Sequence, residues 1–128
     1  MANELILIVE DNEKNRRLVR DVLQAKGYST LDTDNAEEGI VLARERGPAL
    51  ILMDLHLPGI DGIEALGRLR GDPVTQRIPV LAVTASVMTE DRQKILTAGF
   101  DGMQTKPIHI KDFLQAVGDA LAHKDRAA

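Results

Sequence analysis

The sequence predicts an α/β domain built on a five-stranded parallel sheet with helices on both faces. Short strand-like runs alternate with longer amphipathic stretches five times along the chain. Three of the runs, at residues 5–9, 49–53 and 79–83, are continuously apolar, which is typical of strands buried on both faces of a parallel sheet. Alternating strand and helix signals indicate a sheet covered by helices, and right-handed crossovers then leave few topologies.

Helix start and stop signals separate the strands. Asn35 with Glu38, and Asp61 with Glu64, both fit a capping box. Glycines stand where the helices are expected to end. The predicted strands are residues 5–9, 28–33, 49–53, 79–83 and 102–105. The predicted helices are residues 12–26, a helix opened by Asn35 that stops at Gly47, a helix opened by Asp61 that stops before Gly71, residues 88–98, and residues 109–122.

Helical periodicity assigns an inward face to each predicted helix. The last helix has the strongest 3.6-residue period in the chain. The residues expected to face the sheet are Leu18, Val22 and Ala25, with Val19 and Leu23 beside them; Ala36, Ile40 and Ala43; Ile63, Leu66 and Leu69; Ile95 with Leu96; and Ile110, Phe113, Leu114, Val117 and Leu121.

Composition limits the class of protein. A chain of 128 residues with 44% hydrophobic residues suits one domain, which we place at residues 1–123, followed by a frayed tail at 124–128. No apolar stretch approaches the roughly 20 residues of a membrane helix, and the start of the chain does not resemble a signal peptide. The net charge of −4, with no basic stripe and three aromatic residues, argues against nucleic-acid binding. Cysteine is absent, which excludes disulfides and thiolate metal sites. Because disulfides are typical of secreted proteins, we expect a cytoplasmic protein.

Polar side chains stand where four of the strands end. Because the carboxyl ends of parallel strands meet at one edge of the sheet, and ligands bind there, we expect these side chains to converge. They are Glu10 and Asp11 after the first run, Asp54 after the third, Thr84 after the fourth and Lys106 after the fifth.

Three carboxylates in one place repel one another, so that without a counter-charge at least one has a raised pKa. A hard divalent cation removes this repulsion, and Mg²⁺ commonly joins one or two carboxylates to a phosphate. We expect Asp11 and Asp54 as direct ligands, Glu10 acting through water, and the backbone carbonyl of His56 completing the set.

An aspartate beside such a cation can attack phosphorus and form an acyl phosphate. We expect Lys106 to neutralise one phosphoryl oxygen, and the Thr84 hydroxyl and backbone N–H groups such as that of Ala85 to donate to others. Lys106 precedes Pro107, and bonds before proline tolerate the cis isomer. The sequence leaves the isomer of this bond open, but a cis bond here would aim the lysine back across the sheet edge.

Four motifs together resemble the response-regulator receiver family. They are IVEDN at 8–12, LILMDLHLPGIDG at 50–62, VTA at 83–85 and KP at 106–107, and they are most similar to single-domain receivers. The resemblance implies a flavodoxin-like fold and phosphoryl transfer from a histidine kinase, or a histidine phosphotransfer protein, to Asp54. It also implies Mg²⁺ dependence and slow self-catalysed hydrolysis, so the chain is expected not to be a turnover enzyme. By position, Glu10 and Asp11 correspond to the acidic pair of the family. Thr84 corresponds to its switch hydroxyl, and Lys106 to its lysine.

The resemblance has one departure, at Met103. Three residues before the lysine the family often has an aromatic ring that turns inward on activation, and methionine fills that place here. We expect no output domain after the receiver, and therefore expect the signal to leave through a downstream protein target or a relay. The expected surface is formed by residues 88–98, Met103 and residues 110–121, and the chain is expected to be a monomer or weak dimer.

Other interpretations of the same residues are open. Asp11 with Asn12 can simply cap the first helix, and His56 is either a solvated loop residue or an influence on water attack at Asp54. A dehalogenase-type phosphatase also uses an aspartate nucleophile, but it needs a second aspartate where this chain has His56. A flavin-binding module is expected to carry a phosphate cradle, and the loop after Val9 is acidic instead. A receiver-like module that binds partners without phosphorylation would not need the full acidic set.

Overall fold

The sheet has the predicted parallel architecture. In the computed structural model, which describes residues 4–57, 59–84 and 89–127, five parallel strands form one sheet in the order β2-β1-β3-β4-β5. The order reverses beside β1, so that β1 and β3 flank the point where a doubly wound sheet opens a crevice. The strands are β1 (Leu5–Val9), β2 (Ser29–Thr33), β3 (Leu50–Asp54), β4 (Val80–Thr84) and β5 (Gly102–Thr105).

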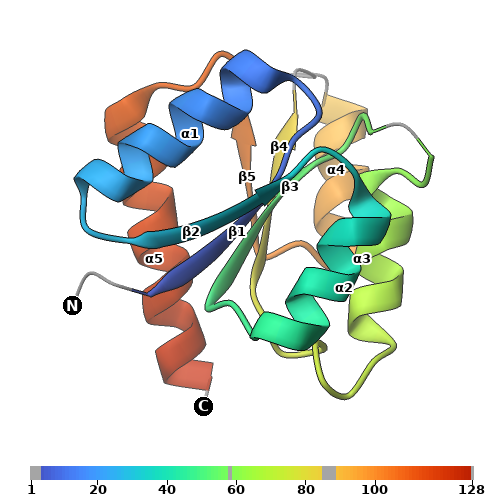
Figure 1. Cartoon of the computed structure of the whole chain (residues 1–128). Coiled ribbons are helices and arrows are strands. Elements are labelled where there is room, and N and C mark those ends of the chain that lie inside the picture. Colours follow the sequence, from blue (N-terminus) through green and yellow to red (C-terminus); the bar gives the residue numbers. More distant parts are fainter. Residues whose placement is uncertain (1–3, 58, 85–88, 128) are drawn as a thin grey trace.

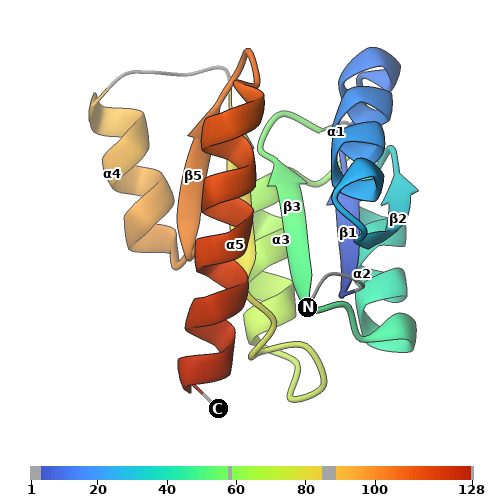
Figure 2. The same ribbon diagram turned by 90° about the vertical axis from the view of Figure 1, so that its left-hand side faces the viewer.

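Helices cover both faces of this sheet (Figure 1). The helices are α1 (Glu13–Ala25), α2 (Ala36–Arg46), α3 (Gly62–Arg70), α4 (Thr89–Ala98) and α5 (Ile110–Ala127). Figure 2 shows α1 and α5 on the face toward the viewer, with β3 visible between them and α2 and α3 behind the sheet. The two faces have separate apolar cores, one with residues of α2, α3 and α4 and the other with residues of α1 and α5.

Capping at the helix starts follows the predicted pattern. The side chain of Asn35 accepts from the N–H of Glu38 at 2.8 Å, and that of Asp61 accepts from the N–H of Glu64 at 2.9 Å. Gly47 ends α2 in the left-handed conformation, with φ of 56°. These caps satisfy backbone donors and acceptors that the helix itself leaves without partners.

The inward faces of several helices differ from the prediction. In α1 the buried residues are Val19 and Leu23, whereas Leu18 is 40% exposed and Ala25 is exposed too. Adjacent apolar positions offer two overlapping stripes in α1, and packing against the sheet selects the one through Val19. Ile63 and Ile110 also lie outward, with exposures of 41% and 50%. The remaining outward residue among those predicted inward is Leu96 of α4.

The ends of some helices and strands also differ from the predicted ends. Asp54 and Thr84 are the last residues of β3 and β4 rather than the first residues after them. Helix α5 continues to Ala127, five residues past its predicted end, so residues 124–127 are helical where a frayed tail was expected. Met88, the predicted start of the fourth helix, and Ala85 lie outside the described residues. Among the described helices, none combines the length and apolar composition needed to span a membrane.

Candidate functional site

The predicted site residues converge at the carboxyl edge of the sheet. Asp54 ends β3, and β3 lies between β1 and β4 in the sheet. Glu10 follows β1, and Thr84 ends β4. Lys106 follows β5, and its backbone N–H donates to the carbonyl of Thr84 at 2.8 Å. Three of these polar side chains are almost fully buried: Glu10, Asp54 and Thr84.

Lys106 binds two of the three carboxylates. Its Nζ lies 3.0 Å from Oδ2 of Asp54 and 2.8 Å from Oε1 of Glu10. The bond between Lys106 and Pro107 is cis, the isomer that the sequence left open. The other oxygen of Asp54, Oδ1, accepts from the N–H of His56 at 3.0 Å. Asp54 is therefore held by a donor on each carboxylate oxygen, which fixes the orientation of the group.

The carboxylates have unequal affinities for protons. Burial, a hydrogen bond shared with Asp54 and the charge of Asp54 raise the pKa of Glu10 to about 7, although Lys106 and the Asn12 N–H oppose the rise. Burial also raises the pKa of Asp54, but hydrogen bonds from Glu10, from the His56 N–H and from Lys106 outweigh burial and hold that pKa below its ordinary value. Of these two carboxylates, Asp54 therefore stays ionised more readily, and Glu10 takes up a proton more readily.

Burial lowers the pKa of Lys106, but its hydrogen bonds to Glu10 and Asp54 outweigh burial and raise it above its ordinary value. The lysine is therefore charged at neutral pH.

An oxygen-rich cluster suited to a divalent cation lies at this edge. Glu10, Asp11 and Asp54 each offer a carboxylate oxygen, and the three oxygens lie within 4.8 Å of one another. Carboxylate oxygens are the donors that Mg²⁺ prefers, so the residues present fit that ion. Of the two residues considered as a cap for α1, Asn12 is the cap, and its side chain accepts from the Asn15 N–H at 3.0 Å.

The start of α3 packs directly on the backbone that carries Asp54. The N–H of Gly62 donates to the carbonyl of Leu55 at 3.2 Å. A Cβ atom at position 62 would lie 2.7 Å from the Asp54 carbonyl oxygen, closer than such atoms approach in proteins. Glycine at this position therefore allows the helix to close on the site.

A pocket extends from the site between α3 and α4. Its volume is about 560 Å³, and its lining includes His56, Thr84 and Ile95. His56 is exposed, which agrees with a solvated loop residue whose backbone, rather than side chain, contacts Asp54. Thr84 has a side chain with no exposed surface and borders this pocket.

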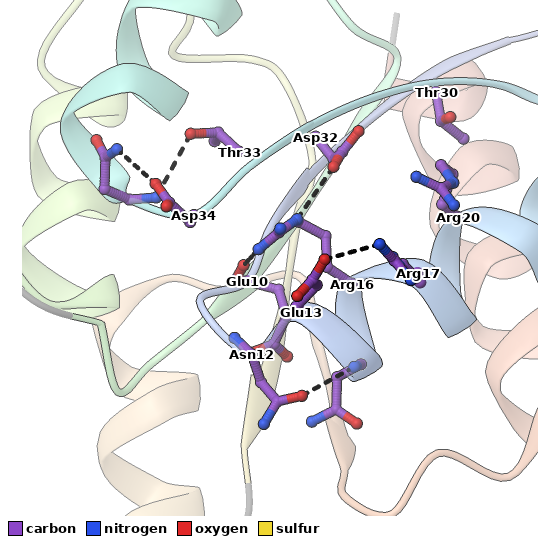
Figure 3. A network of polar contacts seen from close by, with 12 residues as sticks. Glu10, Asn12, Glu13, Arg16, Arg17, Arg20, Thr30, Asp32, Thr33 and Asp34 are labelled. Carbon is purple, nitrogen blue, oxygen red and sulfur yellow. Dashed lines mark hydrogen bonds and ion pairs between the residues drawn. The ribbon is translucent and has the colours of Figure 1, made fainter.

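The sequence did not predict one contact at the site, which is made by Arg16. Figure 3 shows Arg16 of α1 reaching the backbone of Glu10 and the side chain of Asp32 in β2. The distances are 3.0 Å from Arg16 Nη1 to the Glu10 carbonyl oxygen and 3.1 Å from Nε to Asp32 Oδ2. No local pattern reveals this contact, because the partners are brought together by the pairing of β1 with β2.

Comparison with known proteins agrees with this geometry. Residues 6–118 match the family described as the response regulator receiver domain. The polar-differentiation response regulator DivK of Brucella anthropi is 43% identical over 116 residues, which cover 91% of this chain and 94% of DivK. DivK of Brucella ovis is 42% identical with the same coverage.

Solved structures share the fold. A putative response regulator from Chloroflexus aurantiacus has a TM-score of 0.90 and 28% identity, covering 94% of this chain and 98% of that one. The receiver domain of a sensor histidine kinase from Pseudomonas aeruginosa has a TM-score of 0.87 and 28% identity, covering 94% and 99%, and holds a magnesium ion in its active site cleft. With the family model matched over most of its length, the chain belongs to the response regulator receiver domains of two-component systems.

Proposed function

We propose that Asp54 accepts a phosphoryl group from the phosphohistidine of a histidine kinase or of a histidine phosphotransfer protein. The observation that supports this most directly is the state of Asp54: a buried, ionised carboxylate with a lysine on one oxygen and a backbone N–H on the other. Membership of the receiver family gives the same expectation.

In the proposed reaction, an oxygen of Asp54 attacks phosphorus and the bond from phosphorus to the donor imidazole nitrogen breaks. The imidazole leaves with the electrons of that bond and takes up a proton, and an acyl phosphate forms on Asp54. Lys106 contacts the Asp54 carboxylate. Its positive charge can therefore neutralise an oxygen of a phosphoryl group carried by Asp54. The Thr84 hydroxyl, at the next strand end, is proposed to donate to another phosphoryl oxygen.

Glu10, Asp11, Asp54 and the backbone carbonyl of His56 are proposed to hold Mg²⁺. When bound, this ion offsets the negative charge that collects as a phosphoryl group meets three carboxylates. The three-carboxylate cluster supports the assignment, and so does the magnesium ion in the similar receiver of Pseudomonas aeruginosa. Because Glu10 has a raised pKa, uptake of a proton by Glu10 can join Lys106 in reducing the negative charge of the metal-free site.

The proposed output is a protein contact that depends on phosphorylation, or onward relay of the phosphoryl group. The candidate surface is formed by α4, β5 and α5, where Leu96 and Ile110 are large apolar side chains exposed by 59% and 50%. Slow self-catalysed loss of the phosphoryl group, rather than turnover of a substrate, is proposed to end the signal. We further propose a cytoplasmic location, a monomer or weak dimer, and a receiver domain over residues 1–123.

Intact-mass measurement tests the proposal. The wild-type protein is incubated with Mg²⁺ and acetyl phosphate, and separately with a phosphorylated histidine phosphotransfer protein. We expect one phosphoryl adduct, lost when Mg²⁺ is chelated beforehand and absent in Asp54→Asn. Asp61→Asn, which changes an exposed aspartate that caps α3, is the matched control and should keep the adduct.

Two results would contradict the proposal: no adduct on the wild type from either donor, or an equal adduct on Asp54→Asn. Steady turnover of a generic phosphate ester would instead favour a phosphatase. The presence of His56, where such a phosphatase needs a second aspartate, makes that result unexpected.

A further inference from the structure

Arg16 differs from the other arginines of its helix in what it contacts. Its guanidinium donates to the backbone carbonyl of Glu10 at 3.0 Å and to Asp32 Oδ2 at 3.1 Å, and its side chain is 20% exposed. Arg17, the next residue, pairs with Glu13 in an ion pair whose side chains are 64% and 63% exposed. Exposed pairs of that kind contribute little to stability, whereas the contacts of Arg16 join α1 to the ends of β1 and β2 (Figure 3).

The carbonyl that Arg16 binds belongs to the peptide between Glu10 and Asp11. A peptide is planar, so the direction of its oxygen fixes the plane from which the chain continues into Asp11. The N–H of Glu10 is held by the carbonyl of Thr33 at 3.0 Å, at the end of the β1–β2 ladder. Arg16 therefore provides a restraint on the following peptide, beyond the point where the ladder ends.

The side chain of Glu10 is restrained separately. Its Oε2 accepts from the N–H of Asn12 at 3.1 Å, and its Oε1 lies against Lys106. Asp11, between these restrained residues, is exposed and supplies the third oxygen of the acidic cluster. The direction of the Asp11 carboxylate thus depends on the peptide that Arg16 holds.

The anchor of Arg16 comes from the sheet itself. Asp32 pairs in register with Ile8, so β2 sets the position of its carboxylate relative to the end of β1. An arginine can donate to a carbonyl and a carboxylate at once through its planar fork, whereas a lysine presents a single charged nitrogen. The arrangement therefore uses the shape of the guanidinium as well as its charge.

We propose that Arg16 is a positioning residue for the divalent-cation site, and that it acts by orienting the Glu10–Asp11 peptide. The inference rests on the proposed function, in which these two carboxylates hold Mg²⁺. Groups that orient metal ligands typically change metal affinity by roughly tenfold or more when they are altered. Electrostatics alone predicts the opposite sign, because a cation near the site repels Mg²⁺ and its removal strengthens binding.

The test is the dissociation constant of Mg²⁺, measured by isothermal titration calorimetry on the folded protein. Arg16→Lys keeps the charge and loses the fork, and we expect its dissociation constant to rise by roughly tenfold. Arg16→Met removes the charge as well and is also expected to bind more weakly. Arg17→Lys is the matched control and should bind Mg²⁺ as the wild type does. Tighter or unchanged binding in Arg16→Lys and Arg16→Met would overturn the inference.

A second readout separates positioning from general damage. The rate of adduct formation with acetyl phosphate is measured against Mg²⁺ concentration for wild type and Arg16→Lys. We expect the half-saturating concentration to rise by the same factor, with the rate at saturating Mg²⁺ unchanged. A fall in the saturating rate with no change in half-saturation would contradict the inference. Should Arg16→Lys fail to fold, Asp32→Asn tests the same anchor, and an unchanged Mg²⁺ affinity in that variant would overturn it.

The outcomes also distinguish this inference from the proposed function. Weakened Mg²⁺ binding in Arg16→Lys, with no phosphoryl adduct on the wild type, would sustain the positioning role and overturn the phosphoacceptor. A normal adduct on the wild type with unchanged Mg²⁺ affinity in Arg16→Lys would do the reverse. Wild-type protein that does not bind Mg²⁺ would overturn both.

Discussion

The Nζ atom of Lys106 lies 3.0 Å from Oδ2 of Asp54, although 52 residues and one intervening strand separate them. The same nitrogen lies 2.8 Å from Glu10, so one cation serves two carboxylates with side chains only 3% and 6% exposed. Charges buried to this extent need a partner, because desolvation is costly. Lys106 therefore stabilises the metal-free site, and it lies where the proposed phosphoryl group on Asp54 would carry its negative charge.

Replacing Lys106 by methionine should destabilise the metal-free protein. The change keeps the side-chain length and leaves Glu10 and Asp54 without the cation that both contact, and loss of one partner of a buried pair typically costs about 3 kcal/mol or more. Urea denaturation in chelator at neutral pH measures the loss in free energy of unfolding. In the Asp54→Asn background the same replacement should cost less, since one of the two charges is gone. Equal losses in the two backgrounds would show that Lys106 and Asp54 are not coupled.

The stability of the metal-free protein should fall as pH rises through the titration of Glu10. The pKa of Glu10 is about 7 in the folded protein against an ordinary 4.5. Between these values the folded state binds more protons than the unfolded state, so the contribution of Glu10 is fully present below 4.5 and is lost by about pH 7. The expected slope is at most about 1.4 kcal/mol per pH unit.

Comparing wild type with Glu10→Gln isolates this contribution. The two proteins share every other titrating residue, so the difference between their free energies of unfolding in chelator reports mainly on position 10. We expect the wild type to lose stability relative to Glu10→Gln as pH rises from about 5 to about 8. A difference that is flat, or that changes in the opposite direction, would mean that Glu10 is ionised throughout.

Much of the sheet edge was predictable because its signals are local and strong. The run of residues that ends in Asp54 is continuously apolar, and such a run indicates a parallel strand buried on both faces. Once the five predicted strands are accepted as parallel, the carboxyl-end rule brings Asp54, Thr84 and Lys106 together without any knowledge of side-chain contacts. For the bond before Pro107, the sequence allowed a cis isomer without choosing it, and the structure has the cis form.

Other features depend on contacts that periodicity does not encode. Leu18 and Val19 are both apolar, and only packing against the sheet places Val19 inside and Leu18 outside. The role of Arg16 depends on the register that sets Asp32 beside the end of β1. The sequence predicted that one carboxylate would have a raised pKa, but the choice of Glu10 follows from its burial and from its contact with Asp54, which outweigh the opposing effect of Lys106.

Alanine should be tolerated at Gly67 and not at Gly62, although both lie in α3. A Cβ at Gly62 would lie 2.7 Å from the Asp54 carbonyl oxygen and 2.9 Å from Leu55 Cα, and backbone atoms cannot easily yield. We expect Gly62→Ala to cost about 1 to 3 kcal/mol of stability and to slow adduct formation, because the backbone of Asp54 must move. A Cβ at Gly67 meets nothing within 4 Å, and Gly67→Ala should stabilise by about 1 kcal/mol through helix propensity.

Denaturation of the two variants, with the rate of adduct formation from acetyl phosphate, checks this pair. The opposite signs matter more than the magnitudes, since both changes add one methyl group to the same helix. Similar stabilities for the two variants would mean that the start of α3 does not pack closely on the end of β3.

Met103 should make the response to phosphorylation less sharp than an aromatic residue would. It lies on β5, is partly buried, and borders a pocket of about 350 Å³ that also contacts Ala116 of α5. A flexible methionine fills such a space in many conformations, whereas a tyrosine ring has few and so favours two distinct positions. Met103→Tyr should therefore increase the change in amide hydrogen exchange over β5 and α5 that follows phosphorylation. Leu96→Tyr, at an exposed position of α4, controls for adding a ring to the same surface. If Met103→Tyr and wild type show equal changes, position 103 has no part in coupling the site to that surface.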